Sequence, residues 1–421
     1  MRATSHLRYA IVLAALSFRL AAQTPAPAVT FRELAAEALR SSPEVMAAQK
    51  KYEAARQRPA QESALPDPMF SLGYNSVGNP LPGAGIGREP QANAGVMVSQ
   101  ELPYPGKLKL KGEMASKEAQ AAFAEYQSAQ LQVISKLKQA YRRLQFAYAG
   151  SAVLERNREV LYNLLKATED RYATGLAPQQ DVFQAQIQVS LLETRLVRLD
   201  QERRSREAEI NSILNRAALT PLGKPEDLSP KPLTLTLDDL FAAERRNSPM
   251  LQRDQKMIER SETAVNIARK DYYPDVTLNG GYYSMGSMGS MYEVRADVKV
   301  PLYFWRKQRA GVTEQALALA QARRAYEATD QTLRYRIQDD FNMAQASQKL
   351  MSLYTQTLAP QANLAVESSL SSYQSGKTEF PSVLASFTMS LDYAMNYYEE
   401  ALNYSLALAR LEEMTGEPLG D

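Results

Sequence analysis

The chain has 421 residues, with 49 basic and 47 acidic side chains, one histidine and no cysteine. This near-neutral balance excludes nucleic-acid binding through bulk electrostatics. The absence of cysteine excludes disulfides and thiolate zinc sites, and the lone His6 lies in an N-terminal segment that is expected to be removed. Ser-His-Asp and Cys-His nucleophile systems are therefore excluded as well. We expect no enzyme, no cofactor and no nucleic-acid partner.

The N-terminus has the layout of a secretory signal peptide. Arg2 and Arg8 precede an apolar run from Tyr9 to Leu20, and small residues follow that run. The run is too short to span a bilayer. We predict a signal peptide over residues 1–22 and an exported mature chain, with an ordinary N-terminal helix as the alternative. No later run is apolar and long enough to predict a membrane-spanning helix.

The rest of the sequence consists of two copies of one repeat. TFRELAAEALRSSPEV from Thr30 matches TLDDLFAAERRNSPML from Thr236, and RYATGLAPQQDV around Gly175 matches SYQSGKTEFPSV around Gly376. The repeat is far longer than a solenoid unit, so it indicates a duplicated domain. The predicted parts are a first repeat over 23–220 (hairpin about 69–102, tight turn about 172–180), a linker over 221–235, and a second repeat over 236–421 (hairpin about 275–300, tight turn about 373–382).

Each repeat is predicted to run helix, two strands, very long helix, tight turn, helix. Ser42 and Ser248 each precede a proline, the pattern of an N-cap followed by a first-position proline. The long helices reach about 100 Å each, and Pro360 is expected to kink the second one. A coiled-coil rod is the alternative reading. The predicted helices cover 43–64, 107–174, 178–216, 249–272, 306–375 and 381–415, and in each repeat the shorter two stack end to end beside the long one.

The clearest strand signal lies in the second hairpin, where apolar residues alternate with charged ones. Such a strand fits a membrane β-barrel with a polar lumen, and it fits a half-buried soluble sheet equally well. Four strands cannot close a barrel, and backbone groups in lipid cannot stay unpaired. A barrel would therefore be shared, with eight strands from two chains or twelve from three. The charged residues expected to line its lumen are Glu293, Arg295, Asp297 and Lys299.

Over essentially all of the mature chain, the sequence resembles TolC-type outer-membrane efflux proteins. The resemblance rests on RYATGLAPQQDVFQAQ, on Pro103 and Pro301 at the hairpin ends, on PLYFWRKQ and on the closing LEEMTGEPLG. It implies a mainly α fold with a small β part. It also implies a homotrimer with a helical tunnel in the periplasm and a twelve-stranded barrel in outer-membrane lipid, four strands per chain. The implied partners are a periplasmic adaptor and an inner-membrane pump, and the implied role is passive conduction.

The resemblance also implies a gate near the two glycine turns. The motif match makes Asp181 and Tyr373 a candidate hydrogen-bonded gate pair. Helix packing and an ordinary first-turn acid are the alternatives. Some family members carry an acidic ring where this chain has Ser382 and Ala385, so that ring is missing here. The residues expected to contact the adaptor are Arg171, Thr174, Gly175, Ser375, Gly376 and Lys377.

In YYSMGSMGSMYEV, Met285, Met288 and Met291 stand three residues apart between the predicted strands of the second hairpin. Thioethers select soft cations such as Cu(I), and PLYFW resembles a PLW-like sequence of the heavy-metal branch. A flexible exposed loop is the alternative, because Gly and Ser preorganise no site. We predict a duct for heavy-metal cations or small toxic compounds. A drug or secretion duct of the same fold is the first alternative, and a periplasmic structural coiled coil is the second.

Overall fold

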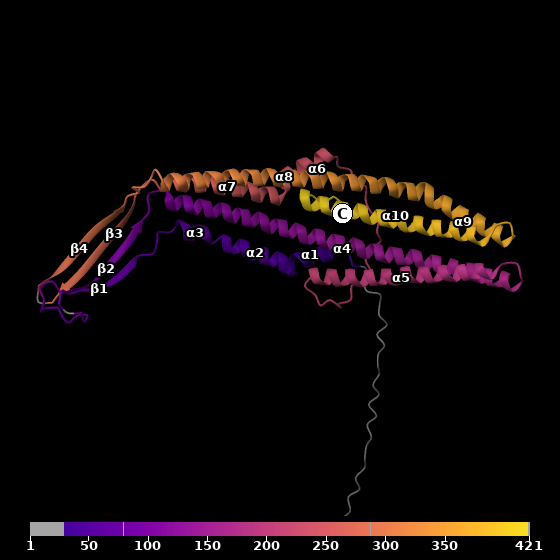
Figure 1. Cartoon of the computed structure of the whole chain (residues 1–421), viewed down its shortest axis with the longest axis horizontal. Coiled ribbons are helices and arrows are strands. Elements are labelled where there is room, and N and C mark those ends of the chain that lie inside the picture. The colour runs from indigo at the N-terminus through magenta and orange to yellow at the C-terminus, as the bar shows by residue number, and fades with distance from the viewer. Residues whose placement is uncertain (1–28, 79, 287, 420–421) are drawn as a thin grey trace, which may run out of the picture.

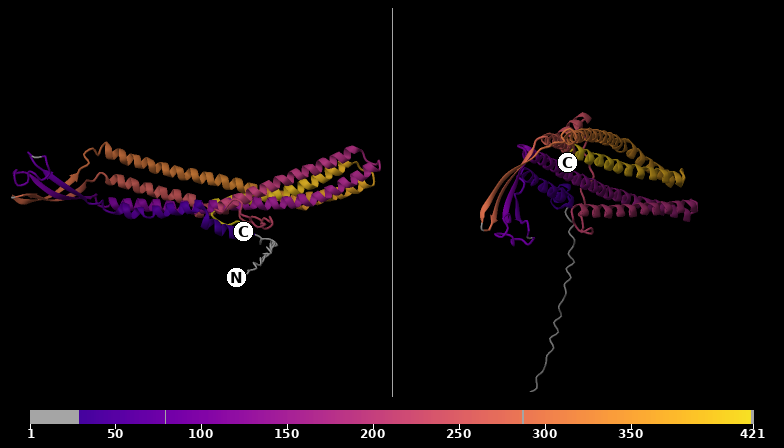
Figure 2. Two further views of the ribbon diagram at one scale, coloured as in Figure 1. Left: turned by 90° about the horizontal axis from the view of Figure 1, so that it is seen from below. Right: turned by 60° about the vertical axis from the view of Figure 1, so that its left-hand side comes forward.

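The computed structural model describes residues 29–419 except 79 and 287. The predicted signal peptide lies outside the described residues. The molecule is elongated, with a sheet at one end and long helices running away from it (Figure 1). Views from two further directions show the same extended arrangement (Figure 2). The predicted fold class, mainly α with a small β part, is confirmed.

Both halves of the chain contain the same order of elements. The first half holds α1 (Phe31–Ser41), α2 (Pro43–Ala55), α3 (Arg58–Ser63), β1 (Met69–Asn75), β2 (Asn93–Leu102), α4 (Lys107–Ala173) and α5 (Gln179–Ile213). The second half holds α6 (Leu237–Asn247), α7 (Pro249–Lys270), β3 (Asp275–Met285), β4 (Met288–Lys299), α8 (Lys307–Leu353), the π-helical turn η1 (Tyr354–Leu358), α9 (Ala359–Gln374) and α10 (Phe380–Thr415).

Local chemistry explains most of the helix starts. Thr236 caps α6 by accepting from the Asp239 N–H, while the Asp239 carboxylate accepts from the Thr236 N–H, which completes a capping box. Pro43 and Pro249 occupy the first helical position as predicted. Ser42 and Ser248 hold the N-cap positions, but neither side chain makes a capping hydrogen bond. The predicted first-position proline is therefore confirmed in both repeats. The predicted serines occupy the N-cap position, but their side chains do not cap the helices.

Two predicted helices are interrupted. The helix predicted over 43–64 breaks into α2 and α3, because Pro59 has no N–H to donate and its ring crowds the carbonyl four residues earlier. The helix predicted over 306–375 changes to the π-helical turn η1 directly before Pro360. A π-helical turn is one way for a helix to accommodate an obstructed hydrogen bond. The interruption predicted at Pro360 is thus confirmed, and the one at Pro59 was missed.

The shorter helices pack along the long ones, as the matching lengths predicted. In the first repeat α2, α3 and α5 all contact α4, and in the second α7 and α10 contact α8. α4 also contacts α7 and α10, so the two repeats form one continuous helical body. At 67 residues α4 is about 100 Å long. Three clusters of buried apolar residues lie along this body. One lies near the two glycine turns, and the other two lie farther from the turns, one in each repeat.

Two buried tyrosines fix the segment that joins the repeats. The Tyr141 hydroxyl donates to the Val29 carbonyl at 2.8 Å and accepts from the Glu226 N–H at 3.2 Å. The Tyr404 hydroxyl donates to the Lys231 carbonyl at 2.7 Å. Both tyrosines are 1 % exposed, so buried side chains of α4 and α10 attach the linker to the helices by hydrogen bonds.

Tyr141→Phe is expected to lower the free energy of unfolding by about 0.5–1.5 kcal/mol, because it removes the part-buried hydrogen bonds to the Val29 carbonyl and from the Glu226 N–H. Denaturant unfolding of the detergent-solubilised protein measures this loss. Tyr335→Phe is the control, since Tyr335 is 69 % exposed. A Tyr141→Phe protein as stable as the control would show that the linker contacts do not contribute to stability.

The four strands form one antiparallel sheet in the order β1-β2-β3-β4. The two strand pairs expected from the alternation are observed, with Phe70 opposite Val98 and Tyr282 opposite Tyr292. The apolar side chains therefore share one face, and the charged ones share the other. Leu72 on that apolar face is 87 % exposed, and Val294 is 92 % exposed, so no described part of the chain covers it.

Candidate functional site

The end of the molecule farthest from the sheet is formed by two glycine turns of the same construction. Gly175 and Gly376 have φ angles of 72° and 74°, which only glycine adopts without strain. The N–H after each glycine donates back into the preceding helix, from Leu176 to the Arg171 carbonyl and from Lys377 to the Ser372 carbonyl, both at 2.8 Å. These are helix-terminating turns of the glycine type, and they bring the two repeats to a common tip.

Arg171 joins the two turns. Its guanidinium donates to the Tyr373 carbonyl at 2.9 Å and to the Gln374 carbonyl at 3.3 Å. It also lies 4.6 Å from the centre of the Tyr373 ring. The structure gives Arg171 a bridging role within the chain, and its predicted contact with an adaptor stays a prediction. No signal in the sequence pointed to that role, because the role depends on the second turn lying beside the first.

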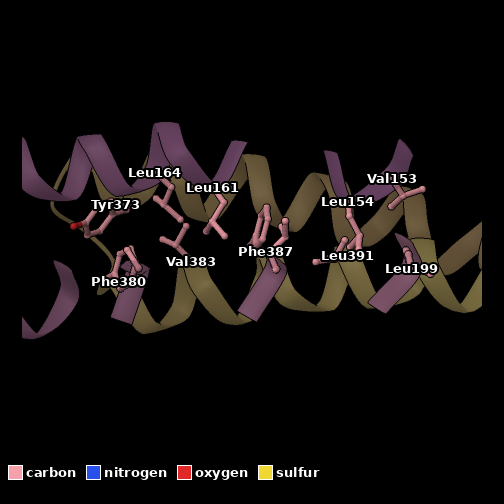
Figure 3. Packing of buried hydrophobic residues seen from close by; sticks show 12 residues of the cluster. Val153, Leu154, Leu161, Leu164, Leu199, Tyr373, Phe380, Val383, Phe387 and Leu391 are labelled. Carbon is pink, nitrogen blue, oxygen red and sulfur yellow. The ribbon is translucent and has the colours of Figure 1, made fainter. Parts of the chain in front are cut away.

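Tyr373 belongs to the hydrophobic core of the tip. It is 2 % exposed and meets Phe380 edge to face with ring centres 5.7 Å apart. Figure 3 shows both rings at one end of a row of aliphatic side chains that includes Leu164 and Val383. Among the described residues no group hydrogen-bonds to the Tyr373 hydroxyl, although that oxygen is buried. The hydroxyl is thus a buried polar group without a partner within the described chain.

Asp181 lies in the first turn of α5 and is 9 % exposed. Burial raises the pKa of its carboxyl, the neighbouring Glu379 raises it further, and Arg171 partly opposes both effects. The structure therefore brings Asp181 and Tyr373 to the same tip, but no hydrogen bond joins them within the described chain. Their role as a gate pair stays a prediction.

The remaining candidates at the tip are exposed. The Thr174 hydroxyl donates to the Asp170 carbonyl at 3.1 Å, and the Ser375 hydroxyl donates to the Ser371 carbonyl at 3.1 Å. Gly376 and Lys377 of the second turn are exposed to solvent. Both hydroxyls thus help to end their own helices, and Lys377 has its ammonium free of any ion pair within the described residues.

The predicted lumen residues share one face of β4 and form a connected polar ladder. Arg295 pairs with Glu293 at 3.3 Å and with Asp297 at 3.0 Å. Asp297 accepts from the Asn279 amide of β3 at 2.8 Å, and Asn279 accepts from Ser99 of β2 at 2.6 Å. Lys299 lies at the end of the same face, opposite Asp275. The polar side chains of the sheet therefore find partners within the sheet, whereas its apolar face has no cover among the described residues.

The methionine segment is strand rather than a flexible loop, which corrects that alternative of the sequence analysis. β3 ends at Met285 and β4 begins at Met288, with these two opposite each other, while Met291 lies opposite Tyr283. Met288 and Met291 are each 43 % exposed. Backbone pairing continues almost to the turn, with a register shift between Tyr283 and Met285 that adds one residue on the β4 side. A thioether metal site there remains a prediction.

Sequence reasoning missed the junction between the sheet and the helices. Lys107 is 6 % exposed and pairs with Asp271 at 3.1 Å and Asp275 at 2.9 Å. Tyr104 and Tyr273 stack nearby with ring centres 4.4 Å apart. A cavity of about 420 Å³ opens beside this pair. Two exposed side chains, Leu302 and Tyr303, line this cavity, and the next two residues in the sequence, Phe304 and Trp305, are exposed as well.

Comparison with known proteins identifies the class. The profile of the outer membrane efflux protein family matches residues 34–216 and 240–417, so the chain belongs to that family. This membership makes it an outer-membrane efflux component rather than an enzyme. A search of curated protein sequences gives no match. Within the described ranges, no helix has the length and apolar character needed to cross a bilayer.

Solved structures share the fold. The outer-membrane channel OprN is 17 % identical with a TM-score of 0.79, covering 92 % of this chain and 89 % of its own. VceC from Vibrio cholerae is 20 % identical with a TM-score of 0.79, covering 92 % and 96 %. CusC, described in connection with transmembrane channel formation, is 15 % identical with a TM-score of 0.77, covering 91 % of each chain.

Proposed function

We propose that this chain forms a homotrimeric exit duct in the outer membrane of a Gram-negative-type bacterium, with its helices extending into the periplasm. The sheet carries the proposal: its apolar face is uncovered, and β1 and β4 have no outer neighbour among the described residues. Lipid can cover the face, but it cannot satisfy the backbone groups of the two edges. Three copies of the four-stranded sheet give twelve strands and close it.

The rest of the protomer fits this role. The ladder of Glu293, Arg295, Asp297 and Lys299 would face the water-filled lumen, because that side of a membrane barrel is polar. The helices would form a tunnel about 100 Å long. Its narrow end would be the tip around Arg171 and Tyr373, where a periplasmic adaptor and an inner-membrane pump would dock. In such a system the pump supplies the energy and the duct supplies a gated path.

For the cargo we propose heavy-metal cations or small toxic compounds. Support for metals comes from Met285, Met288 and Met291, which gather thioethers at the hairpin end farthest from the tip. The solved structures with this fold carry different names and do not favour one cargo. An organic-compound or protein exit duct is the second candidate, because the same helices and sheet would serve it.

Growth inhibition of a strain that lacks the gene tests the cargo. Copper, silver, zinc and cobalt salts are compared with a set of dyes and detergents. We expect sensitivity to the metals if the proposed cargo is right, and complementation by the intact gene restores growth. Sensitivity to dyes and detergents alone would favour the organic cargo, and a water-soluble protein in cell fractions would contradict the duct itself.

The methionines are tested in the same strain. Complementation with Met285→Ser, Met288→Ser and Met291→Ser together is expected to leave copper and silver sensitivity in place while trimer assembly is retained. Met389→Ser is the matched control, because Met389 is an exposed methionine on α10, away from the hairpin. Full resistance to copper and silver in the triple variant would show that the three methionines have no role in metal efflux.

A further inference from the structure

A group of buried polar atoms without partners lies where α6 packs on α8. Glu244 is 0 % exposed, and neither of its carboxylate oxygens has a hydrogen-bond partner among the described residues. The Ser248 hydroxyl is buried nearby in the same condition. Arg334 of α8 also lies 5.7 Å from the centre of the Phe241 ring of α6. A carboxylate buried without donors is costly unless it takes up a proton.

The first repeat shows that packing at this position does not need a carboxyl group. Ala38 is the residue that corresponds to Glu244 in the duplicated sequence, and it is also 0 % exposed. The neighbouring Ser42 and Ser248 correspond as well and are both buried. A methyl group thus fills the equivalent place in α1. The fold therefore does not require the volume of a carboxyl group at this position. What Glu244 adds is a group that can bind a proton.

Among the described residues, no charged group around Glu244 hydrogen-bonds to its carboxylate. On α8, Asp330 lies 3.1 Å from Arg334, so the arginine charge is shared with that acid. On α7, Asp254 is occupied by Arg253 and Thr329. The other charged groups in this region are engaged elsewhere or exposed, namely Arg245, Arg246 with Glu417, and Arg410 with Asp340.

We propose that Glu244 is a proton-binding site that makes the packing of α6 on α8 depend on pH. The pKa of this carboxyl is raised to about 7, mainly by burial and also by the nearby Asp330, while Arg245 opposes the rise in part. The folded protein then holds a proton that the unfolded chain releases near pH 4.5. Stability from this site is full below that pH and is lost as the pH rises toward 7.

The site matters for a periplasmic protein because α8 continues through η1 into α9 and the tip. This consequence rests on the proposed location in the periplasm, whose pH follows that of the medium. Proton binding itself does not depend on the proposed function. Fractionation of cells tests the location, and the experiment below tests the site, so the two can fail separately.

The test compares the intact protein in detergent with Glu244→Gln and Glu244→Ala between pH 4 and pH 8. The wild-type unfolding equilibrium constant is expected to rise by on the order of a hundredfold more than that of Glu244→Gln over this range. Amide hydrogen exchange of α6, corrected for intrinsic rates, measures the same loss of stability within that helix. Asp238→Asn is the control on the same helix, because Asp238 is exposed, and it should follow the wild type.

Difference infrared spectroscopy supplies a direct reading of the proton. A protonated carboxyl band that titrates near pH 7 is expected in the wild type and absent in Glu244→Gln. Glu244→Ala reproduces the first repeat, so it should fold and also lack the band. The proposal is overturned if the wild type and Glu244→Gln share one pH dependence, or if the band is missing from the wild type.

Discussion

Glu412→Ala is expected to lower the free energy of unfolding by about 3–5 kcal/mol, because it removes the carboxylate of a buried ion pair and leaves the lysine charge inside. Lys138 is 2 % exposed, and its ammonium lies 2.8 Å from each Glu412 oxygen. Glu412 also accepts from the Leu419 N–H at 2.9 Å. The pair joins α4 of the first repeat to α10 of the second, so its loss should loosen the contact between the repeats.

Denaturant unfolding of the solubilised protein measures this effect, and two variants sharpen it. Glu53→Ala removes one acid of an exposed pair with Lys50 and should change stability little, because water screens exposed pairs. The double change Lys138→Met with Glu412→Leu should recover most of the loss, since apolar residues of similar size can replace a buried pair. A Glu412→Ala protein that matches Glu53→Ala would refute the account of this contact.

Arg171→Ala is expected to open the tip. The variant loses the charge-assisted hydrogen bonds to the Tyr373 and Gln374 carbonyls and the contact with the Tyr373 ring. Such hydrogen bonds contribute about 1.5–3 kcal/mol, so the population with separated turns should rise roughly 10- to 100-fold. Conductance of the purified protein in planar bilayers measures it, and the variant should conduct more than the wild type.

Two substitutions test whether geometry or charge matters at this position. Arg171→Lys keeps the charge but cannot reproduce the planar fork of donors, so it should conduct at an intermediate level. Lys377→Ala removes an exposed charge on the neighbouring turn and should leave conductance unchanged. If Arg171→Ala conducts like the wild type, then Arg171 does not hold the tip together.

Strict periodicity made much of the fold predictable. The alternation after Tyr292 predicted which side chains share the apolar face, because a pleated strand has only two faces, and the observed pairing of Tyr292 with Tyr282 agrees with it. The glycines of the turns gave the helix ends, because a positive φ favours glycine. The break at Pro59 was missed because a first-position proline and a helix-breaking proline look alike until the preceding turn is known.

The site was less predictable, since its chemistry depends on burial. Nothing in the local sequence separates Glu244, which is 0 % exposed, from the exposed acids of the same helix. The bridging role of Arg171 needs the second turn to lie beside the first, which is a tertiary fact. The methionines looked like loop because Gly and Ser favour turns, yet cross-strand pairing extended the hairpin through them.

The number of chains in the membrane-extracted particle tests the central proposal most directly. Outer membranes are separated, the protein is extracted in mild detergent, and light scattering corrected for detergent gives the protein mass. We predict three chains in a particle recovered from the outer-membrane fraction, because three four-stranded sheets close without a free edge. A water-soluble monomer in the periplasmic fraction would contradict the duct.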